Sequence, residues 1–124
     1  MVAFQSPHAK RDCIESCTAC ESLCAETVEY CRKDERLGTD EELIAVLMAC
    51  ADICGTSART LIGGSSVHVH TCRACAAVCE RAAKLCGDHP GDGLLRACAS
   101  ACTLAARCCN DIVHAYSPLQ GSAG

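Results

Sequence analysis

The chain has 124 residues, of which fifteen are cysteines and only three, Phe4, Tyr30 and Tyr116, are aromatic. One domain of this length can bury a core, but an ordinary core filled with aromatic rings is excluded, so cysteines must occupy much of the interior. The net charge of −4, with no block of Lys or Arg, argues against a nucleic acid or an anionic membrane as a partner.

Residues that start and stop helices predict four of them, over residues 7–36, 40–62, 66–86 and 93–116 of one domain spanning 1–124. For the first helix, Ser6-Pro7 offers an N-cap and a first-turn proline, and Gly38 the left-handed residue that ends it. The run TDEE (39–42) has the pattern of a capping box and opens the second helix. Gly63-Gly64 ends that helix.

The third helix is expected to be capped by Ser65 or Ser66 and to stop near Gly87. Asp92 can cap the fourth helix, and Ser117-Pro118 is expected to end it near Tyr116. Short connections between four helices favour an all-α, antiparallel up-down-up-down four-helix bundle.

The two halves of the chain repeat. A shift of 55 residues places Cys17, Cys20, Cys24 and Cys31 onto Cys72, Cys75, Cys79 and Cys86, and places Cys13 onto His68. A shift of 48 residues places Cys50 and Cys54 onto Cys98 and Cys102. The bundle is therefore expected to be a duplicated helical hairpin with a cysteine-lined core.

The spacing of the cysteines puts their thiols on the inward helix faces. In the first and third helices the repeated offsets fall within about 60° of one another at 100° per residue. His68 shares this phase, whereas Cys108 lies roughly a quarter turn off the stripe of the fourth helix. The predicted metal ligands are Cys13, Cys17, Cys20, Cys24, Cys31, Cys50, Cys54, His68, Cys72, Cys75, Cys79, Cys86, Cys98, Cys102 and Cys109. Ligation by Cys108, His70, Met48 and His114 stays open.

Soft thiolates bind Cu(I), zinc and iron–sulfur clusters. Four thiolates around Zn²⁺ leave a formal charge of −2, which is costly in a narrow core whose inward faces carry no Lys or Arg. Cu(I) with an equal number of thiolates is neutral, and each sulfur can bridge two ions. Multiple Cu(I) ions per chain are therefore the predicted cargo.

Three alternatives stay open. A general buffer for zinc or heavy metals, similar to metallothionein, would use the same thiols. The C-x2-C-x3-C runs at 17–24 and 72–79 resemble part of a ferredoxin motif, but they lie in predicted helices and lack the final Cys-Pro. The pairs Cys17/Cys20 and Cys72/Cys75 could belong to a thiol-disulfide oxidoreductase, although no strand precedes them. Without another catalytic constellation, we expect a binding protein and not an enzyme.

The doubled hairpin, the inward CxxxC pairs and the HVH (68–70) before CRAC resemble the cytosolic bacterial copper-storage protein family over residues 7–116. The resemblance implies storage of many Cu(I) ions for copper homeostasis and detoxification, assembly as a homotetramer, and no catalysis. Exported relatives carry a signal peptide and methionines at the mouth of the bundle, and this chain has only Met1 and Met48. No signal-peptide run or stretch of roughly 20 apolar residues is visible, so a cytoplasmic location with reduced thiols is expected.

The ends of the expected bundle differ. One end should hold an apolar plug of Leu43, Leu47, Met48 and Leu94 or Leu95, and the other Cys13, His68 and Cys109. We expect Cu(I), exchanged with a cytosolic copper carrier, to pass at the His68 end. The expected register groups the other thiols in three layers: Cys24, Cys50, Cys79 and Cys102; Cys20, Cys54 and Cys75; Cys17, Cys72 and Cys109.

Overall fold

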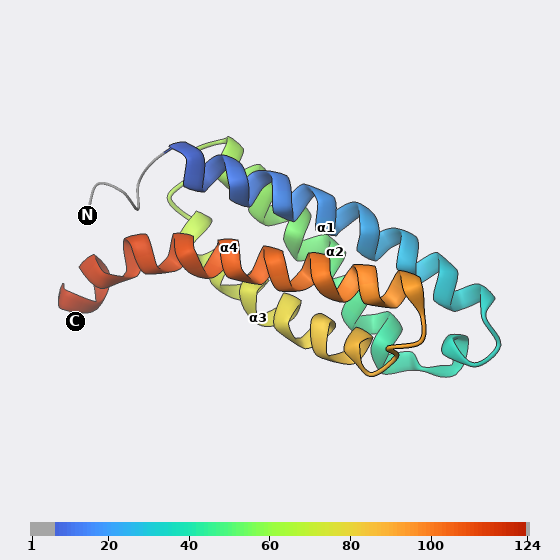
Figure 1. Cartoon of the computed structure of the whole chain (residues 1–124). Helices are drawn as coiled ribbons and strands as arrows, with labels where there is room; N and C mark the ends of the chain where they lie inside the picture. The colour runs from blue at the N-terminus through green and yellow to red at the C-terminus, as the bar shows by residue number, and fades with distance from the viewer. Residues whose placement is uncertain (1–6, 124) are drawn as a thin grey trace.

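The computed structural model describes residues 7–123, with side chains for residues 8–116, and no strand occurs among them. The elements are α1 (Pro7–Lys33), the short 3-10 helix η2 (Leu37–Thr39), α2 (Glu41–Ile62), α3 (His68–Gly87) and α4 (Gly93–Ala123). Each α-helix packs on the next, and α4 closes the ring against α1 (Figure 1). The predicted all-α four-helix bundle is confirmed.

The two ends of the bundle are built from different connections. The start of α1, the α2–α3 connection and the C-terminal part of α4 lie together at one end (Figure 1), which we call the His68 end. The α1–α2 and α3–α4 connections lie at the other, which we call the Cys31 end. Helix α1 therefore begins, and helix α4 ends, on the side of His68.

The start and end of α2 follow from local chemistry. Asp40 is its N-cap, and the Asp40 carboxylate accepts a hydrogen bond of 3.1 Å from the backbone N–H of Leu43. The TDEE run (39–42) was expected to open the helix as a capping box. The cap within it is Asp40, whereas the Thr39 hydroxyl donates a hydrogen bond to the carbonyl of Arg36, three residues earlier. Gly64 follows the helix with φ of 66°, a conformation that suits glycine, so the expected end at Gly63-Gly64 is confirmed.

The expectation for Gly38 is wrong. Helix α1 ends at Lys33, and Gly64 is the one described residue with positive φ, so Gly38 is not left-handed. Gly38 instead lies against the C-terminus of α1, where a Cβ would sit 3.2 Å from the carbonyl oxygen of Cys31. Close approach of two backbones, not an unusual φ, explains a glycine here. The expected cap Ser6 lies outside the described residues.

The predicted start of α3 and the predicted end of α4 are also wrong. Helix α3 starts at His68 after Val67, which makes no side-chain cap; Ser65 instead accepts from the N–H groups of Val67 and His68 in the preceding turn. Helix α4 continues past residues 117–118 to Ala123. A proline removes one helical hydrogen bond and can bend a helix without ending it. At the start of α4, the predicted cap Asp92 is confirmed, because its carboxylate accepts from the N–H of Leu95.

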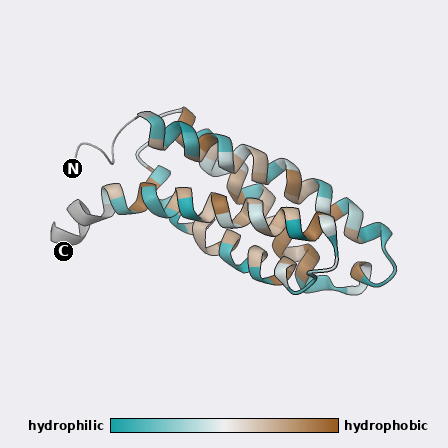
Figure 2. Cartoon of the chain, viewed as in Figure 1, coloured by the Kyte–Doolittle hydropathy of each residue, from teal (hydrophilic) through white to brown (hydrophobic). Residues whose placement is uncertain are grey.

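The core runs along the inner face of all four helices. Hydrophobic and hydrophilic residues alternate along each helix, as Figure 2 shows, and fourteen of the fifteen cysteines are buried. Leucines pack around the thiols at the Cys31 end, and Leu61 and Ile112 are buried with them in the same cluster. Sulfur thus takes the place that Leu and Ile usually hold in a bundle.

Helix α2 is long and apolar enough to cross a membrane by length and composition alone, with a mean hydropathy of 1.4 over its most apolar window. The expectation that no stretch would meet this criterion is therefore wrong. Leucines, isoleucines and a valine contribute most of that hydropathy. The helix packs against α1 and α3 and buries Leu43, Leu47, Cys50 and Cys54 in the core, as a core helix of a bundle does.

Asp92 joins two elements at the Cys31 end. One carboxylate oxygen caps α4 through Leu95, and the other accepts a 2.5 Å hydrogen bond from the Tyr30 hydroxyl on α1. These two bonds hold the pKa of Asp92 below its ordinary value, the Tyr30 bond having the larger effect. We expect Asp92→Ala to lower the free energy of unfolding of the metal-free protein by about 1 kcal/mol or more. Denaturant unfolding under reducing conditions measures it, with Tyr30→Phe, which keeps the helix cap, as the milder control. Equal effects of the two variants would contradict the capping role.

Candidate metal centre

Twelve of the fourteen buried thiols form one connected column along the bundle axis. Cys54 lies 3.5 Å from Cys79 and 3.6 Å from Cys75, between α2 and α3. Cys102 on α4 lies 3.7 Å from both Cys20 and Cys24 on α1. These sulfur–sulfur distances are near van der Waals contact, so one ion placed between neighbouring sulfurs could be reached by several of them.

The thiols gather into four groups in which all sulfur atoms lie within 4.8 Å of one another. Both four-thiol groups contain Cys20 and Cys50, and Cys54 belongs to one four-thiol and one three-thiol group. The sites therefore share ligands and are not separate. The groups are Cys20, Cys50, Cys54 and Cys79; Cys20, Cys24, Cys50 and Cys102; Cys13, Cys72 and Cys109; and Cys17, Cys54 and Cys75.

The expected layers agree with the contacts to about one helical turn. The pairs Cys24–Cys102 at 3.7 Å, Cys50–Cys79 at 3.6 Å, Cys54–Cys75 at 3.6 Å and Cys17–Cys109 at 3.6 Å each lie within one predicted layer. Contacts also cross the layers, since Cys20 meets Cys102 and Cys54 meets Cys79. The column is thus more continuous than a stack of separate layers.

His68 stands at one end of the column and is 8% exposed. Its two ring nitrogens are shielded from solvent and have no hydrogen-bond partner in the described part of the chain. The other buried polar side chains are satisfied, since Thr27 donates to the Leu23 carbonyl and Ser57 to the Thr71 carbonyl. A buried imidazole without a partner is costly unless something binds it, which is the property expected of a metal ligand.

Tyr116 covers His68 from α4. The two rings meet edge to face, with centroids 4.7 Å apart and an interplanar angle of 73°. Cys72 follows His68 by one helical turn, and His68 helps to lower the pKa of the Cys72 thiol. The imidazole therefore lies between an aromatic lid and the first thiols of the column.

Hydrogen bonds between thiols divide the protons unevenly. Bonds from Cys109 and then Cys13 lower the pKa of Cys17 to about 6 and that of Cys72 to about 4, while the pKa of Cys109 is raised through its bonds to Cys13 and Cys17. A thiolate is stabilised when neighbouring S–H groups donate to it. At the His68 end, Cys13 and Cys109 therefore hold their protons most firmly, and Cys17 and Cys72 are the sulfurs that ionise most readily.

The Cys31 end differs in chemistry. Burial, followed by the Asp92 carboxylate, raises the pKa of Cys31 to about 11. Leu43, Leu47 and Leu95 are fully buried here, as predicted for the apolar plug at this end. Leu37 on η2 is buried with them; sequence reasoning did not identify it, although it lies alone among polar residues and glycine between the first two helices.

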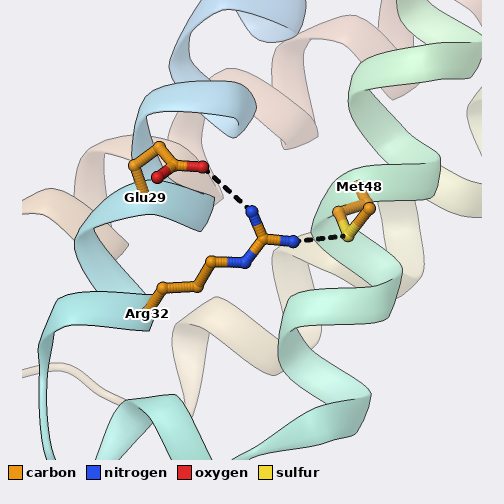
Figure 3. Close-up of polar contacts among 3 residues, drawn as sticks. All are labelled: Glu29, Arg32 and Met48. Carbon is orange, nitrogen blue, oxygen red and sulfur yellow. Dashed lines mark hydrogen bonds and ion pairs between the residues drawn. The ribbon is translucent and has the colours of Figure 1, made fainter.

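Met48 does not belong to this plug. Its side chain is 45% exposed, and its sulfur accepts a 3.4 Å hydrogen bond from Arg32, which also pairs with Glu29 at 3.0 Å (Figure 3). A small groove between α1 and α2 includes Met48, Val28 and Glu29. The thioether thus lies on the outer surface of the bundle.

Three further residues whose ligation was left open also lie off the column. His70 and His114 are exposed, and His114 lines a surface groove of about 510 Å³ between α3 and α4 that contains no described cysteine. Cys108 is partly exposed, with its sulfur 3.5 Å from the Ser16 hydroxyl. The quarter-turn offset of Cys108 in the sequence already indicated this position.

Comparisons with known proteins agree with this geometry. Residues 6–114 match the model of a family described as copper storage protein (Csp). A comparison with curated protein sequences finds no match. Among solved structures, a cytosolic copper storage protein from Streptomyces lividans loaded with five coppers is 28% identical, with a TM-score of 0.81 over 86% of this chain and 93% of that one.

Two other solved structures are similar to the same degree. Cu(I)-bound copper storage protein BsCsp3 is 28% identical, with a TM-score of 0.80 over 85% of this chain and 98% of that one. A histidine-to-alanine variant of Streptomyces lividans Ccsp is 27% identical, with a TM-score of 0.83 over 88% and 95% of the two chains. With a four-helix bundle, a buried thiol column and a family match over most of its length, this chain belongs to the copper storage protein family.

Proposed function

We propose that the protein stores several Cu(I) ions on the thiolates of its core, in the cytoplasm, and so keeps free copper low without catalysing a reaction. Fourteen buried thiols carry this proposal, twelve of them joined by close sulfur contacts into one column. All fifteen cysteines are free, as ligation of a soft metal requires. The homotetramer implied by the family resemblance is part of the proposal and rests on that resemblance alone.

Charge and ligand sharing favour Cu(I) over zinc. No Lys or Arg is buried among the described residues, so nothing offsets the surplus negative charge of four thiolates on one Zn²⁺. Because Cys20 and Cys50 belong to both four-thiol groups, the groups cannot act as independent tetrahedral zinc sites. Bridging thiolates with a monovalent ion use the same geometry and leave the core close to neutral.

Burial disfavours the oxidoreductase alternative. Both cysteines of the pairs Cys17/Cys20 and Cys72/Cys75 have no exposed surface. A catalytic dithiol has to be reached by the disulfide that it reduces. A storage site has no such requirement, because only an ion needs to pass.

The proposed ligands are the buried cysteines together with His68. Cys108, His70, His114 and Met48 lie off the column and are not proposed as ligands of the stored ions. The set is Cys13, Cys17, Cys20, Cys24, Cys31, Cys50, Cys54, His68, Cys72, Cys75, Cys79, Cys86, Cys98, Cys102 and Cys109.

Titration of the reduced, metal-free protein under anaerobic conditions tests the proposal. We expect on the order of one Cu(I) per buried thiolate, taken up against a competing chromophoric chelator, because bridging keeps the core near neutrality. A parallel titration with Zn(II) is the control, and the same thiols should hold zinc more weakly. A Cu(I) plateau at one or two equivalents, or zinc that copper cannot displace, would refute storage.

The same function predicts a route past His68. The ring nitrogens of His68 are buried and without a partner, one helical turn before Cys72, so they can accept Cu(I) before it reaches the column. We expect His68→Ala to slow Cu(I) loading and removal and to leave the capacity within about one ion. Stopped-flow transfer from a chromophoric Cu(I) chelator measures the rates, with exposed His114→Ala as the matched control. Equal rates in the two variants would place the route elsewhere.

A further inference from the structure

A pocket of about 420 Å³ opens against His68 at the His68 end. Its walls come from the first turns of α1, the α2–α3 connection, the start of α3 and the last described side chain of α4. The lining residues are Lys10, Gly64, Ser65, Ser66, His68, Val69 and Tyr116.

The polar groups of this pocket suit an anion. Lys10 is partly buried and makes no ion pair within the described part of the chain, and no carboxylate lines the pocket among those residues. The hydroxyls of Ser65 and Ser66 and the positive N-terminal end of α3 lie on the same side. On a chain of net charge −4, this is a local positive site in front of an unpartnered, nine-tenths buried imidazole.

We propose that this pocket binds the anionic Cu(I) complex of a low-molecular-weight thiol that carries carboxylate groups, and delivers its copper to His68. The inference rests on the proposed storage function and names the donor. Pockets of roughly 300–1,000 Å³ hold small molecules, so the volume suits a thiol of tripeptide size. Lys10 and the two serines would hold its carboxylates while the copper faces the imidazole.

The transfer is a ligand exchange without oxidation or reduction. A donor in which two thiolates hold one Cu(I) carries one negative charge on its metal centre. Two protein sulfurs replace the two donor thiolates, and two free donor thiols leave. A protein thiol gives its proton to the departing thiolate, and where the protein sulfur is already ionised the departing thiolate takes its proton from water. Copper remains Cu(I) throughout, and the imidazole of His68 holds the ion between the first and second replacement.

Stopped-flow loading from Cu(I)–glutathione tests the site. We expect Lys10→Glu to slow loading about tenfold at low salt, since charge reversal removes an attraction and adds a repulsion at the mouth. Lys84→Glu is the matched control, because Lys84 is exposed in the last turn of α3, and it should leave the rate within about twofold. Cu(I) held by 2-mercaptoethanol carries the same charge on its metal centre but no carboxylate, so Lys10→Glu should slow loading from this donor by no more than about twofold.

A donor mimic that has no free thiol to bind copper tests binding in the pocket separately from copper transfer. S-methylglutathione should inhibit loading of the wild type from Cu(I)–glutathione competitively and should not inhibit Lys10→Glu. Equal slowing of the donors with and without carboxylates, or no competition by the mimic, would refute binding of the donor in this pocket. If Lys10→Glu retains full Cu(I) capacity and wild-type rates, this inference fails and storage stands; a capacity of one or two ions in the wild type refutes storage itself.

Discussion

Filling the reduced protein with Cu(I) should raise its thermal unfolding midpoint by more than about 20 °C. Each ion bound only to the folded state contributes about 4 kcal/mol when free ligand exceeds Kd a thousandfold. In a domain of this size, 1 kcal/mol corresponds to about 3–6 °C. The free energy that several bound ions add therefore exceeds the whole free energy of unfolding of most metal-free domains, which is about 5–15 kcal/mol.

The rise in the unfolding midpoint depends on each copper site taking its thiols from different helices. The four-thiol groups draw Cys20 from α1, Cys50 from α2, Cys79 from α3 and Cys102 from α4. These residues are far apart in sequence and meet only when the bundle is formed. An unfolded chain still offers local CxxxC pairs to copper, which reduces the difference but cannot reproduce the sites made across helices.

Differential scanning calorimetry or circular dichroism, under anaerobic conditions at increasing Cu(I) equivalents, measures the shift. Zinc at the same equivalents is the control and should raise the midpoint less, because its thiolate sites carry surplus charge. A midpoint that stays within about 5 °C of the metal-free value would mean that copper binds outside the folded core.

The position of the thiols could be predicted because it depends on helical phase alone. Cys13, Cys17, Cys20, Cys24 and Cys31 recur at helical intervals, and such residues share one face whatever the rest of the fold is. All five are buried, as are their counterparts on α3. The same criterion places Met48 outside, because Met48 is one residue after the buried Leu47 and so points about 100° away from it. Including Met48 in the plug was an error of phase.

The errors that remain concern the ends of elements, where several local solutions have similar energy. Asp40 and Thr39 are both good N-caps, and only the path of the chain through η2 decides between them. Gly38 permits a left-handed turn, but its closeness to the Cys31 carbonyl is a contact between segments. Sequence alone does not contain that contact.

The environment of His68 was only half predictable. Its phase with the thiol stripe follows from the sequence, and its burial follows from that phase. The edge-to-face contact with Tyr116 and the pocket beside Lys10 require three segments, from residues 10 to 116, to meet at one end of the bundle. Such long-range juxtapositions depend on the packing of the whole bundle and cannot be read from one helix.

Removing two shared thiols should cost more copper than removing two terminal ones. We expect Cys20→Ala/Cys50→Ala to lose about three Cu(I) ions, because each thiol can bridge two ions and the two thiols, 4.0 Å apart in the same two groups, share one of them. The matched pair Cys31→Ala/Cys86→Ala lies at the end of the column, outside the four groups, and should lose about two. Cys108→Ala, off the column, should lose none.

Alanine is the right replacement because it deletes the sulfur without burying an unsatisfied hydroxyl. Anaerobic Cu(I) titration against a chelator gives the capacities, and the helical signal of each metal-free variant checks that the bundle still forms. The difference between the two double variants is the informative quantity, since both remove two sulfurs from the core. If storage used separate sites with private ligands, the two variants would lose equal amounts of copper. A larger loss for the central pair, with Cys108→Ala unchanged, is what a column of bridging thiolates requires.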